Sequence, residues 1–513
     1  MHHILCGLAA NPALPAPLLD RLIALADEDV AEVLASRADL TRPQTAALLA
    51  RVPASAARLA SEGRLTAADI DPATQPEAAL TLLREGRGDP EHARALIAHG
   101  EALAACPGLP PDVVARLAAD DDVQVVAELA LWATGDVLLE LARHPHAEVR
   151  RAAAVNEATP ASVLAALLTG EGVPAALRCL VCDREDAPFV HDPSCPRTDC
   201  DLRAGASCDG THESTVHDTR LAAVQHPSTP VAALLTCVDD HSSLLVRWAL
   251  AARRDLPPEA YERLVRSNEP GVRAELAENP AIGEALMRML AGDAGHDVRR
   301  RLAHNPRVPL DVLVRLAGGS RIGGPAPLPR VVAASREEVE ELARSASPAV
   351  RMLVARRRDL PDGVRDVLAW DADAKVAGSV ASHPGLDDGQ LRALVDRHGV
   401  RVVAQVAANP DAAPELLEDI GRREPGARKA LREIARHPRA SGPALRHCLA
   451  DGRARVLAAA HPNLPPDAVV ELLGDPGGEV VEAAAAHPAL PREVMAELLA
   501  GAWPDAGRVQ DRW

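Results

Sequence analysis

A phrase that recurs about every 26 residues constrains the fold of this chain more than any other feature. A clear copy is Val298–Pro306, which reads Val-Arg-Arg-Arg-Leu-Ala-His-Asn-Pro. We call the residue at the Asn305 position of each copy the anchor residue. Anchor residues are 26 positions apart in three separate stretches, which are Asn11, Arg37 and Gly63, then Arg253, Asn279 and Asn305, and then Arg357, His383 and Asn409. A fixed period of this length predicts a stack of similar structural units.

Each copy predicts two short helices. Val298, Leu302 and Asn305 are spaced to lie on one face of a helix, which Pro306 ends. Pro309 then starts a second helix, where its missing N–H removes no needed hydrogen bond. Such a pair is too small to bury its apolar face alone, so neighbouring copies must cover it. We therefore expect an all-α, right-handed α-solenoid of roughly 18–19 two-helix units.

Composition agrees with a close stack and limits the function. The 513 residues include five Trp, one Tyr and one Phe, so the core must be built mainly from Ala, Val and Leu. The net charge of −17 argues against a general nucleic-acid coat and against a protein that binds anionic membranes. No signal peptide or transmembrane run is visible, and we expect a cytoplasmic protein with mostly reduced thiols.

The repeated phrase resembles the leucine-rich repeat variant family. The shared pattern is Val-Arg-x-x-Leu-Ala-x-Asn/His-Pro-x-Leu-Pro-x-x-Val-Leu-x-x-Leu, and it covers nearly all of 1–168 and 219–502. The resemblance implies a right-handed superhelix of alternating α- and 3₁₀-helices. The period here is longer than that family's unit, and HEAT-like repeats are similar in style. We expect helical repeats in 1–168, an insertion in 169–218, further repeats in 219–502 and a tail in 503–513.

Two polar positions recur in every clear copy. Histidine alternates with asparagine and arginine at the anchor position, and we expect these side chains to form a ladder of bonds to exposed backbone groups. The arginine after each valine should emerge at the edge of the stack. It could bond to acidic turns such as Asp297 or Glu148, or line a groove for an acidic partner. The arginines concerned are Arg150, Arg247, Arg273, Arg299 and Arg351.

A cysteine-rich segment interrupts the repeats. It contains Cys179, Cys182, Cys195, Cys200, Cys208 and His212, and it has too few apolar residues to fold by burial alone. Cys179-x2-Cys182 can present two thiolates to one metal ion, and two more from Cys195, Cys200 and Cys208 would complete a tetrahedral site. Structural zinc is the main prediction, with His212 as an alternative ligand. Iron–sulfur ligation, disulfides and plain reduced thiols remain alternatives.

Two further resemblances bear on the iron–sulfur alternative. Some leucine-rich repeat variant proteins carry a four-iron cluster domain at the N-terminus. Cys208-Asp-Gly-Thr-His212 is also similar to the closing motif of CDGSH-type two-iron proteins, in which that Cys and His are ligands. The Cys-x-Cys pair that precedes it in that family is missing, because Thr198 stands two residues before Cys200.

No motif for catalysis is visible. The chain lacks a phosphate-binding glycine loop, a His-Glu-x-x-His pair and a Gly-x-Ser-x-Gly nucleophile turn. We expect a non-enzymatic scaffold that binds a partner protein, with the insertion as its specificity element. The alternative is an iron–sulfur redox or sensor protein that uses the repeats as a docking platform.

Overall fold

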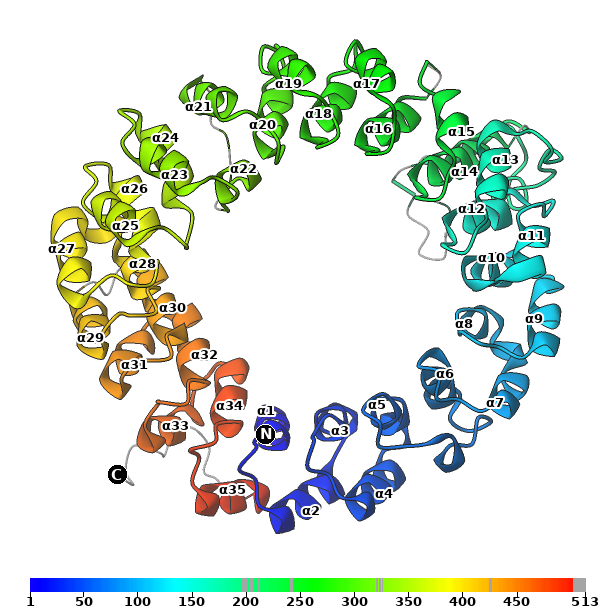
Figure 1. Ribbon diagram of the computed structural model, residues 1–513. Coiled ribbons are helices and arrows are strands. Elements are labelled where there is room, and N and C mark those ends of the chain that lie inside the picture. Colours follow the sequence, from blue (N-terminus) through cyan, green and yellow to red (C-terminus); the bar gives the residue numbers. More distant parts are fainter. Residues whose placement is uncertain are drawn as a thin grey trace. The chain divides into compact units, whose positions relative to one another are not determined.

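The described part of the chain is helical apart from one short pair of strands. The computed structural model describes residues 1–192, 194–195, 202, 206–210, 212–239, 243–319, 322, 324, 326–423 and 427–501. Helices follow one another along all of these ranges except in the segment between 170 and 212 (Figure 1). Of the helices in these ranges, none has both the length and the apolar character needed to cross a bilayer.

The chain divides into two compact units. Unit 1 consists of Met1–Arg64 together with Gly323–Trp513, and unit 2 consists of Leu65–Ile322. The cysteine-rich insertion therefore lies within unit 2. Within each unit the repeats contribute a first helix to one row and a second helix to another row, and like helices pack against like.

The first helices precede the anchor residues. In unit 1 they are α1 (His2–Ala10), α3 (Glu28–Ala35), α5 (Ala56–Ser61), α22 (Pro329–Val332), α24 (Pro348–Ala355), α26 (Ala374–Ala381), α28 (Val403–Ala407), α30 (Arg428–Arg436), α32 (Gly452–Ala459) and α34 (Gly478–Ala485). In unit 2 they are α6 (Pro76–Arg84), α8 (Gly100–Ala104), α10 (Val123–Trp132), α12 (Ala147–Val155), α14 (Glu213–Gln225), α16 (Leu244–Ala252), α18 (Pro270–Glu278) and α20 (His296–His304).

The second helices follow the anchor residues. In unit 1 they are α2 (Ala16–Leu25), α4 (Arg42–Arg51), α23 (Arg336–Ala343), α25 (Asp362–Ala369), α27 (Asp388–His398), α29 (Pro414–Arg423), α31 (Gly442–Cys448), α33 (Pro466–Leu472) and α35 (Arg492–Leu499). In unit 2 they are α7 (Pro90–Ala95), α9 (Pro111–Ala118), α11 (Gly135–Leu141), α13 (Ala161–Thr169), α15 (Val231–Leu235), α17 (Pro258–Leu264), α19 (Glu284–Leu290) and α21 (Leu310–Gly319).

The second helices are mainly α-helical, which differs from the alternation that the family resemblance implies. The 3₁₀ segments of the described residues are η1 (Pro53–Ser55), η2 (Ala67–Asp69), η3 (Ile97–His99) and η4 (Gly399–Arg401). The longer repeat explains the difference, because it gives many second helices seven or more residues after a proline-rich start. A segment of that length can form full i→i+4 hydrogen bonds, as α33 does after Pro465.

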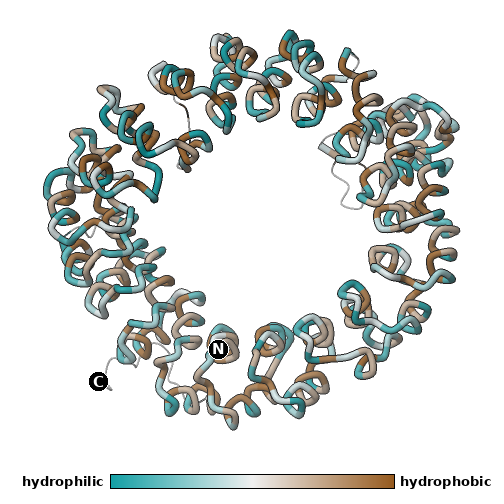
Figure 2. Tube along the Cα trace, viewed as in Figure 1, coloured by the Kyte–Doolittle hydropathy of each residue, from teal (hydrophilic) through white to brown (hydrophobic). Residues whose placement is uncertain are grey.

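Small aliphatic side chains fill the core, as the composition predicts. Val298, Leu302 and Ala303 of α20 are fully buried, and apolar stretches recur from repeat to repeat (Figure 2). Tyr261 is a buried exception, and its hydroxyl donates to the Arg253 carbonyl at 3.0 Å. Trp132, by contrast, is 57% exposed. The close packing of the first helices accepts few rings.

The anchor residues form the predicted ladder. The Asn305 side-chain amide donates to the carbonyls of Ala277 at 2.9 Å and Asn279 at 2.8 Å, and its oxygen accepts the Arg307 N–H at 2.9 Å. Since Asn279 is the preceding anchor, each such residue ties its repeat to the one before. The same arrangement holds for Asn156, Asn279 and Asn409.

Histidine fills the same position with equivalent bonds. His461 Nε2 donates to the His437 carbonyl at 3.0 Å, and its Nδ1 accepts the Asn463 N–H at 3.1 Å. Each such ring is therefore held as the neutral Nε2–H tautomer. Burial lowers the pKa of His461, which favours this neutral form. His226, His437 and His487 make the matching pair of bonds.

The first repeat packs against the last one within unit 1. Helix α1 lies beside α34, and α2 contacts α35 (Figure 1). Asn11 donates to the carbonyls of Ala485 and of the anchor His487, both at 2.9 Å. These are the bonds that other anchors make to the repeat before them. The ladder of unit 1 therefore runs from His487 directly to Asn11.

Candidate metal centre

The insertion begins where α13 ends. Gly170 has φ +78° and closes that helix, and α14 starts at Glu213. Between them lie the Cys179–Cys182 turn and an antiparallel pair of strands, β1 (Phe189–Val190) and β2 (Ser207–Cys208), with Phe189 opposite Cys208. A turn, a strand end and a helix start thus each supply potential ligands.

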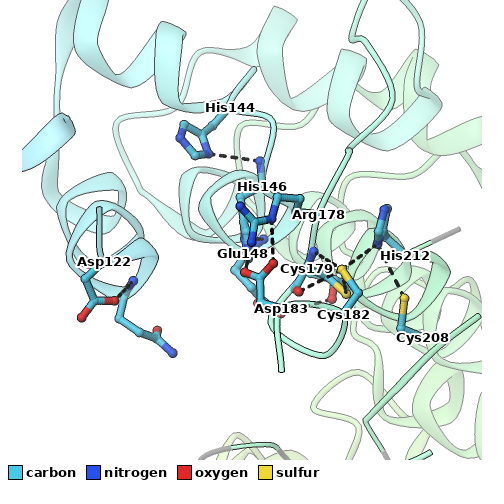
Figure 3. A network of polar contacts seen from close by, with 12 residues as sticks. Asp122, His144, His146, Glu148, Arg178, Cys179, Cys182, Asp183, Cys208 and His212 are labelled. Carbon is cyan, nitrogen blue, oxygen red and sulfur yellow. Dashed lines mark hydrogen bonds and ion pairs between the residues drawn. The ribbon is translucent and has the colours of Figure 1, made fainter. Parts of the chain in front are cut away.

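Four ligand atoms converge at this point. The sulfurs of Cys179, Cys182 and Cys208 and a ring nitrogen of His212 all lie within 4.8 Å of one another (Figure 3). The Cys179 and Cys182 sulfurs are 3.7 Å apart. His212 Nδ1 lies 3.7 Å from the Cys182 sulfur and 3.6 Å from that of Cys208.

These separations match a tetrahedron around one ion. With Zn–S bonds of about 2.3 Å and Zn–N bonds of about 2.0–2.1 Å, a tetrahedral ion places two sulfurs about 3.8 Å apart and a sulfur and nitrogen about 3.5 Å apart. We call these four residues the Cys3His cluster, which consists of Cys179, Cys182, Cys208 and His212. The cluster could therefore hold a metal ion. Cys179, Cys208 and His212 are buried, which shields such an ion from solvent.

The backbone around the cluster supports charged sulfur. The Cys179 N–H donates to the Cys182 sulfur at 3.2 Å, and the Gly210 N–H donates to the Cys208 sulfur at 3.3 Å. Donation of this kind stabilises a thiolate. Burial has the opposite effect and is the largest cause of the net shift, which raises the pKa of the Cys179 thiol to about 12. A bound cation would offset that burial penalty, since metal ligation deprotonates a thiol.

The chain reaches the cluster through constrained backbone. His212 has φ +60°, a left-handed conformation that non-glycine residues seldom adopt, and Gly210 has φ +98°. This turn places the His212 ring beside Cys208 and directly before the first residue of α14. Strained backbone of this kind is typical of ligand-binding positions.

Polar residues around the cluster attach the insertion to α12. His146 Nε2 lies 2.9 Å from Asp183, and the Arg178 guanidinium donates to the other oxygen of Asp183 at 2.7 Å (Figure 3). The Ala147 N–H also donates to the Arg178 carbonyl at 2.9 Å. Asp183 follows Cys182 directly, so these bonds fix the turn that carries two of the ligands.

Among the described residues of the insertion, the buried apolar core is small. It consists of Ala147, Cys179, Val181, Leu202 and Cys208, with a few half-buried neighbours such as Phe189. Two of its five buried members are cluster cysteines. This supports the expectation that apolar burial alone does not order the segment.

The structure brings together four of the six predicted metal ligands. Cys195 is described but does not belong to the cluster, and Cys200 lies outside the described residues. The expected second thiolate pair is therefore replaced by Cys208 and the imidazole of His212. The spacing of cysteines alone could not decide this, because Cys208-x3-His212 reaches the site only through the turn at Gly210. Cys6, Cys106, Cys237 and Cys448 are buried core residues, as predicted.

The repeated arginines are occupied within the chain. Arg273 bonds to Asp293 and Arg351 to Asp371, with closest distances of 2.7 and 2.6 Å. Arg299 donates to the Ala294 carbonyl at 3.0 Å.

Arg150 and Arg247 are buried. Arg150 donates to the carbonyls of His144 and Pro174 at 2.5 Å each. Bonding to acidic turns is thus confirmed for Arg273 and Arg351, but the acceptors differ from the predicted ones. Asp297 binds Arg300, and Glu148 accepts from Thr215 and Arg151.

A pocket with a mixed polar and apolar lining, which sequence reasoning missed, lies beside the cluster. It has a volume of about 690 Å³, and we call it the insertion groove. Its lining includes Phe189, Val190, Val216, Leu244 and Leu245. Val190 is 73% exposed and Leu245 is 45% exposed. A signal was present in the sequence, because Leu244-Leu245 occupy the positions that His296-Asp297 occupy in a clear repeat.

No family model matches the chain, and no curated protein matches it. The residues and geometry above therefore carry the functional argument.

Proposed function

We propose that this protein is a non-enzymatic scaffold that binds a partner protein through the insertion groove. The observation that carries the proposal is the exposure of Val190, Val216, Leu244 and Leu245 around one pocket. An apolar cluster of this kind on the surface of a protein is typical of an interaction site. The repeats supply two walls of the groove through α14 and α16, and the insertion supplies the third.

The Cys3His cluster holds the insertion in the shape that forms this groove. Cys208 both belongs to the cluster and lines the groove, so metal binding and groove shape are linked through one residue. In this proposal the metal is zinc in a closed structural site. Four protein ligands leave no position for a reactive water.

The iron–sulfur alternative is less well supported by the ligand spacing. A two-iron or four-iron cluster has its ligands on different metal atoms, which spreads them further apart than one ion does. The four ligand atoms here lie within 4.8 Å of one another, which favours a single ion. A redox or sensor role would require the larger group.

The finer architecture belongs to the same proposal. We infer that the repeats form a right-handed α-solenoid of the leucine-rich repeat variant or HEAT-like type. The ladder of anchor residues between successive repeats supports this arrangement. Free cysteines throughout the described residues are consistent with a reducing, cytoplasmic location.

Two measurements test the proposal. Protein purified without oxygen should be colourless and contain one zinc per chain by elemental analysis. A brown protein with iron and inorganic sulfide would support the alternative instead. A protein without bound metal would contradict both assignments.

The partner is tested by affinity capture and mass spectrometry. Val190→Asp or Leu245→Asp should abolish capture of the partner, because each introduces a charge into the insertion groove. Val367→Asp is the matched control, since Val367 is 62% exposed on α25, outside the groove. Loss of the same protein with all three variants would contradict the proposed site.

A further inference from the structure

A second pocket lies in unit 1, on the first-helix row. It has a volume of about 900 Å³ and is lined by residues of three consecutive repeats, from α24, α26 and the η4–α28 segment. Its lining contains four cationic side chains, which are Arg356, Arg358, Lys375 and Arg401. Asp373 is the one carboxylate in this lining. We call these four cations and their surroundings the basic pocket. Such a gathering is unusual in a chain with a net charge of −17.

The carboxylate does not neutralise these cations. Asp373 caps α26, where its side chain accepts the Lys375 backbone N–H at 2.8 Å. Over the described residues, the side chains of the four pocket cations make neither an ion pair nor a hydrogen bond. The neighbouring arginines behave differently, because Arg351 pairs with Asp371 and Arg357 pairs with Asp359. Carboxylates are thus available nearby, and the pocket cations remain without one.

An unsatisfied histidine provides an independent observation. His383 lines the basic pocket and is 3% exposed, and its Nδ1 has no hydrogen-bond partner. At the other ladder histidines this atom accepts the N–H two residues further on. Here that residue is Gly385, whose N–H donates instead to Asp411 at 2.6 Å. A buried polar atom without a partner is costly, and a donor from a ligand, such as a peptide N–H, could remove that cost.

Burial and charge agree with the same interpretation. Burial, together with the nearby charges of Arg358 and Arg365, lowers the pKa of His383 to about 4. Burial also lowers the pKa of the Arg356 guanidinium. Both groups are therefore held where a positive charge is poorly compensated, and a bound anion would stabilise them.

The layout of the cations indicates the shape of the ligand. Neighbouring packed helices lie about 8–10 Å apart, so three consecutive first helices spread the cations over roughly 20 Å. One small anion cannot contact groups that far apart. An extended peptide advances about 3.3 Å per residue, so a segment of about six residues spans the distance. Alternate side chains of such a segment point the same way and can meet successive repeats.

We propose that the basic pocket binds an extended acidic segment of a protein partner through carboxylates at alternate positions. The inference rests on the proposed scaffold function and adds the chemistry of a second contact. Guanidinium groups suit this ligand because they bind carboxylates with two parallel hydrogen bonds. Ser379 and Ser382 add hydroxyl donors to the lining.

Fluorescence anisotropy on the full-length protein tests this inference. The probe is a labelled peptide with glutamate at alternate positions over six residues, and the comparison peptide carries glutamine at those positions. The glutamate peptide should bind, with affinity that falls as salt rises. Lys375→Gln with Arg401→Gln should weaken its binding by about tenfold, because both side chains are exposed and contribute charge alone. Arg356→Gln should weaken binding as well.

A matched double variant controls for net charge. Arg336→Gln with Arg344→Gln removes the same charge from α23 and its C-cap residue, where both side chains are about three-quarters exposed (75% and 74%) and pair with Glu340. It should leave peptide affinity unchanged. Equal binding of the two peptides, or an equal loss in both double variants, would overturn the proposal. So would tighter binding of a single-stranded DNA of the same charge, which would indicate a nucleic-acid ligand.

The experiments distinguish failure of the basic-pocket proposal from failure of the scaffold proposal. Partner capture through the insertion groove depends on Val190 and Leu245 in unit 2. If a partner were still captured through that groove but the peptide showed no charge-dependent binding, only the proposal for the basic pocket would be contradicted.

Discussion

The repeats and the insertion reach an ordered structure in different ways. Each repeat buries one face of two helices against its neighbours and ties them with an anchor residue such as Asn305. The insertion has a small core, and three cysteines and one histidine gather at its centre. We propose from this comparison that metal ligation takes the place of apolar burial in the insertion. The repeats should therefore respond to loss of anchor bonds, and the insertion to loss of metal.

The largest expected effect separates the two regions directly. Removing the metal with a chelator, or changing Cys208 to Ser, should unfold the insertion and leave the repeats folded. Structural zinc sites contribute about 10–16 kcal/mol of apparent binding free energy, which far exceeds what the small core can supply. Hydrogen exchange should show lost protection around 177–191 and 206–210, with α18 and α20 unaffected.

Cys195→Ser is the matched control for this experiment. Cys195 lies in the same segment but outside the Cys3His cluster. Its replacement should leave zinc content and exchange unchanged. If Cys195→Ser lost zinc as completely as Cys208→Ser, the ligand set would be wrong.

A smaller effect is expected in the ladder. Asn305→Ala should lower the free energy of unfolding by about 3 kcal/mol, because it leaves the buried carbonyls of Ala277 and Asn279 without their donor. Chemical denaturation measures the change. Asn305→His should recover most of the loss, since histidine makes equivalent bonds at His437 and His461. A rescue by serine instead of histidine would argue against the ladder.

The smallest expected effect is a pH dependence that belongs to the repeats. The folded-state pKa of His383 is about 4, below the value of about 6.5 for an unfolded histidine. The unfolded chain then binds more protons between these values, so stability falls as pH drops below about 6.5. At pH 5 the loss from this residue is about 2 kcal/mol.

His383→Asn should remove that part of the pH dependence, because asparagine occupies the same ladder position at Asn409 without titrating. Denaturation curves at pH 7.5 and pH 5 measure the difference. His296→Asn, at an exposed position on α20, is the control and should keep the full dependence. An unchanged pH dependence in His383→Asn would show that other groups cause it.

Sequence reasoning predicted the repeats well because their cause is local and periodic. The positions of Val298, Leu302 and Pro306 specify a helix, its buried face and its end. The alternation of Asn, His and Arg at the anchor position was enough to predict the ladder. The Cys179–Cys182 pair was predicted for the same reason, since both ligands lie in one short turn.

The remaining features depend on contacts between distant residues. His212 joins the Cys3His cluster only because of a left-handed turn that the sequence around Gly210 does not specify alone. The basic pocket depends on which carboxylates each arginine finds, and Arg356 and Arg357 are adjacent in sequence but differ completely in their partners. The packing of α1 on α34 joins residues more than 470 positions apart, as the Asn11–Ala485 bond shows. No periodic signal reports such a contact.

That contact has a consequence for synthesis on the ribosome. Unit 1 contains both Met1–Arg64 and the segment from Gly323 onward, so residues 65–322 are made between its two parts. The apolar face that α1 presents to α34 stays uncovered while residues 65–322 are made and folded. During synthesis the chain therefore carries an uncovered apolar helix face until α34 leaves the ribosome.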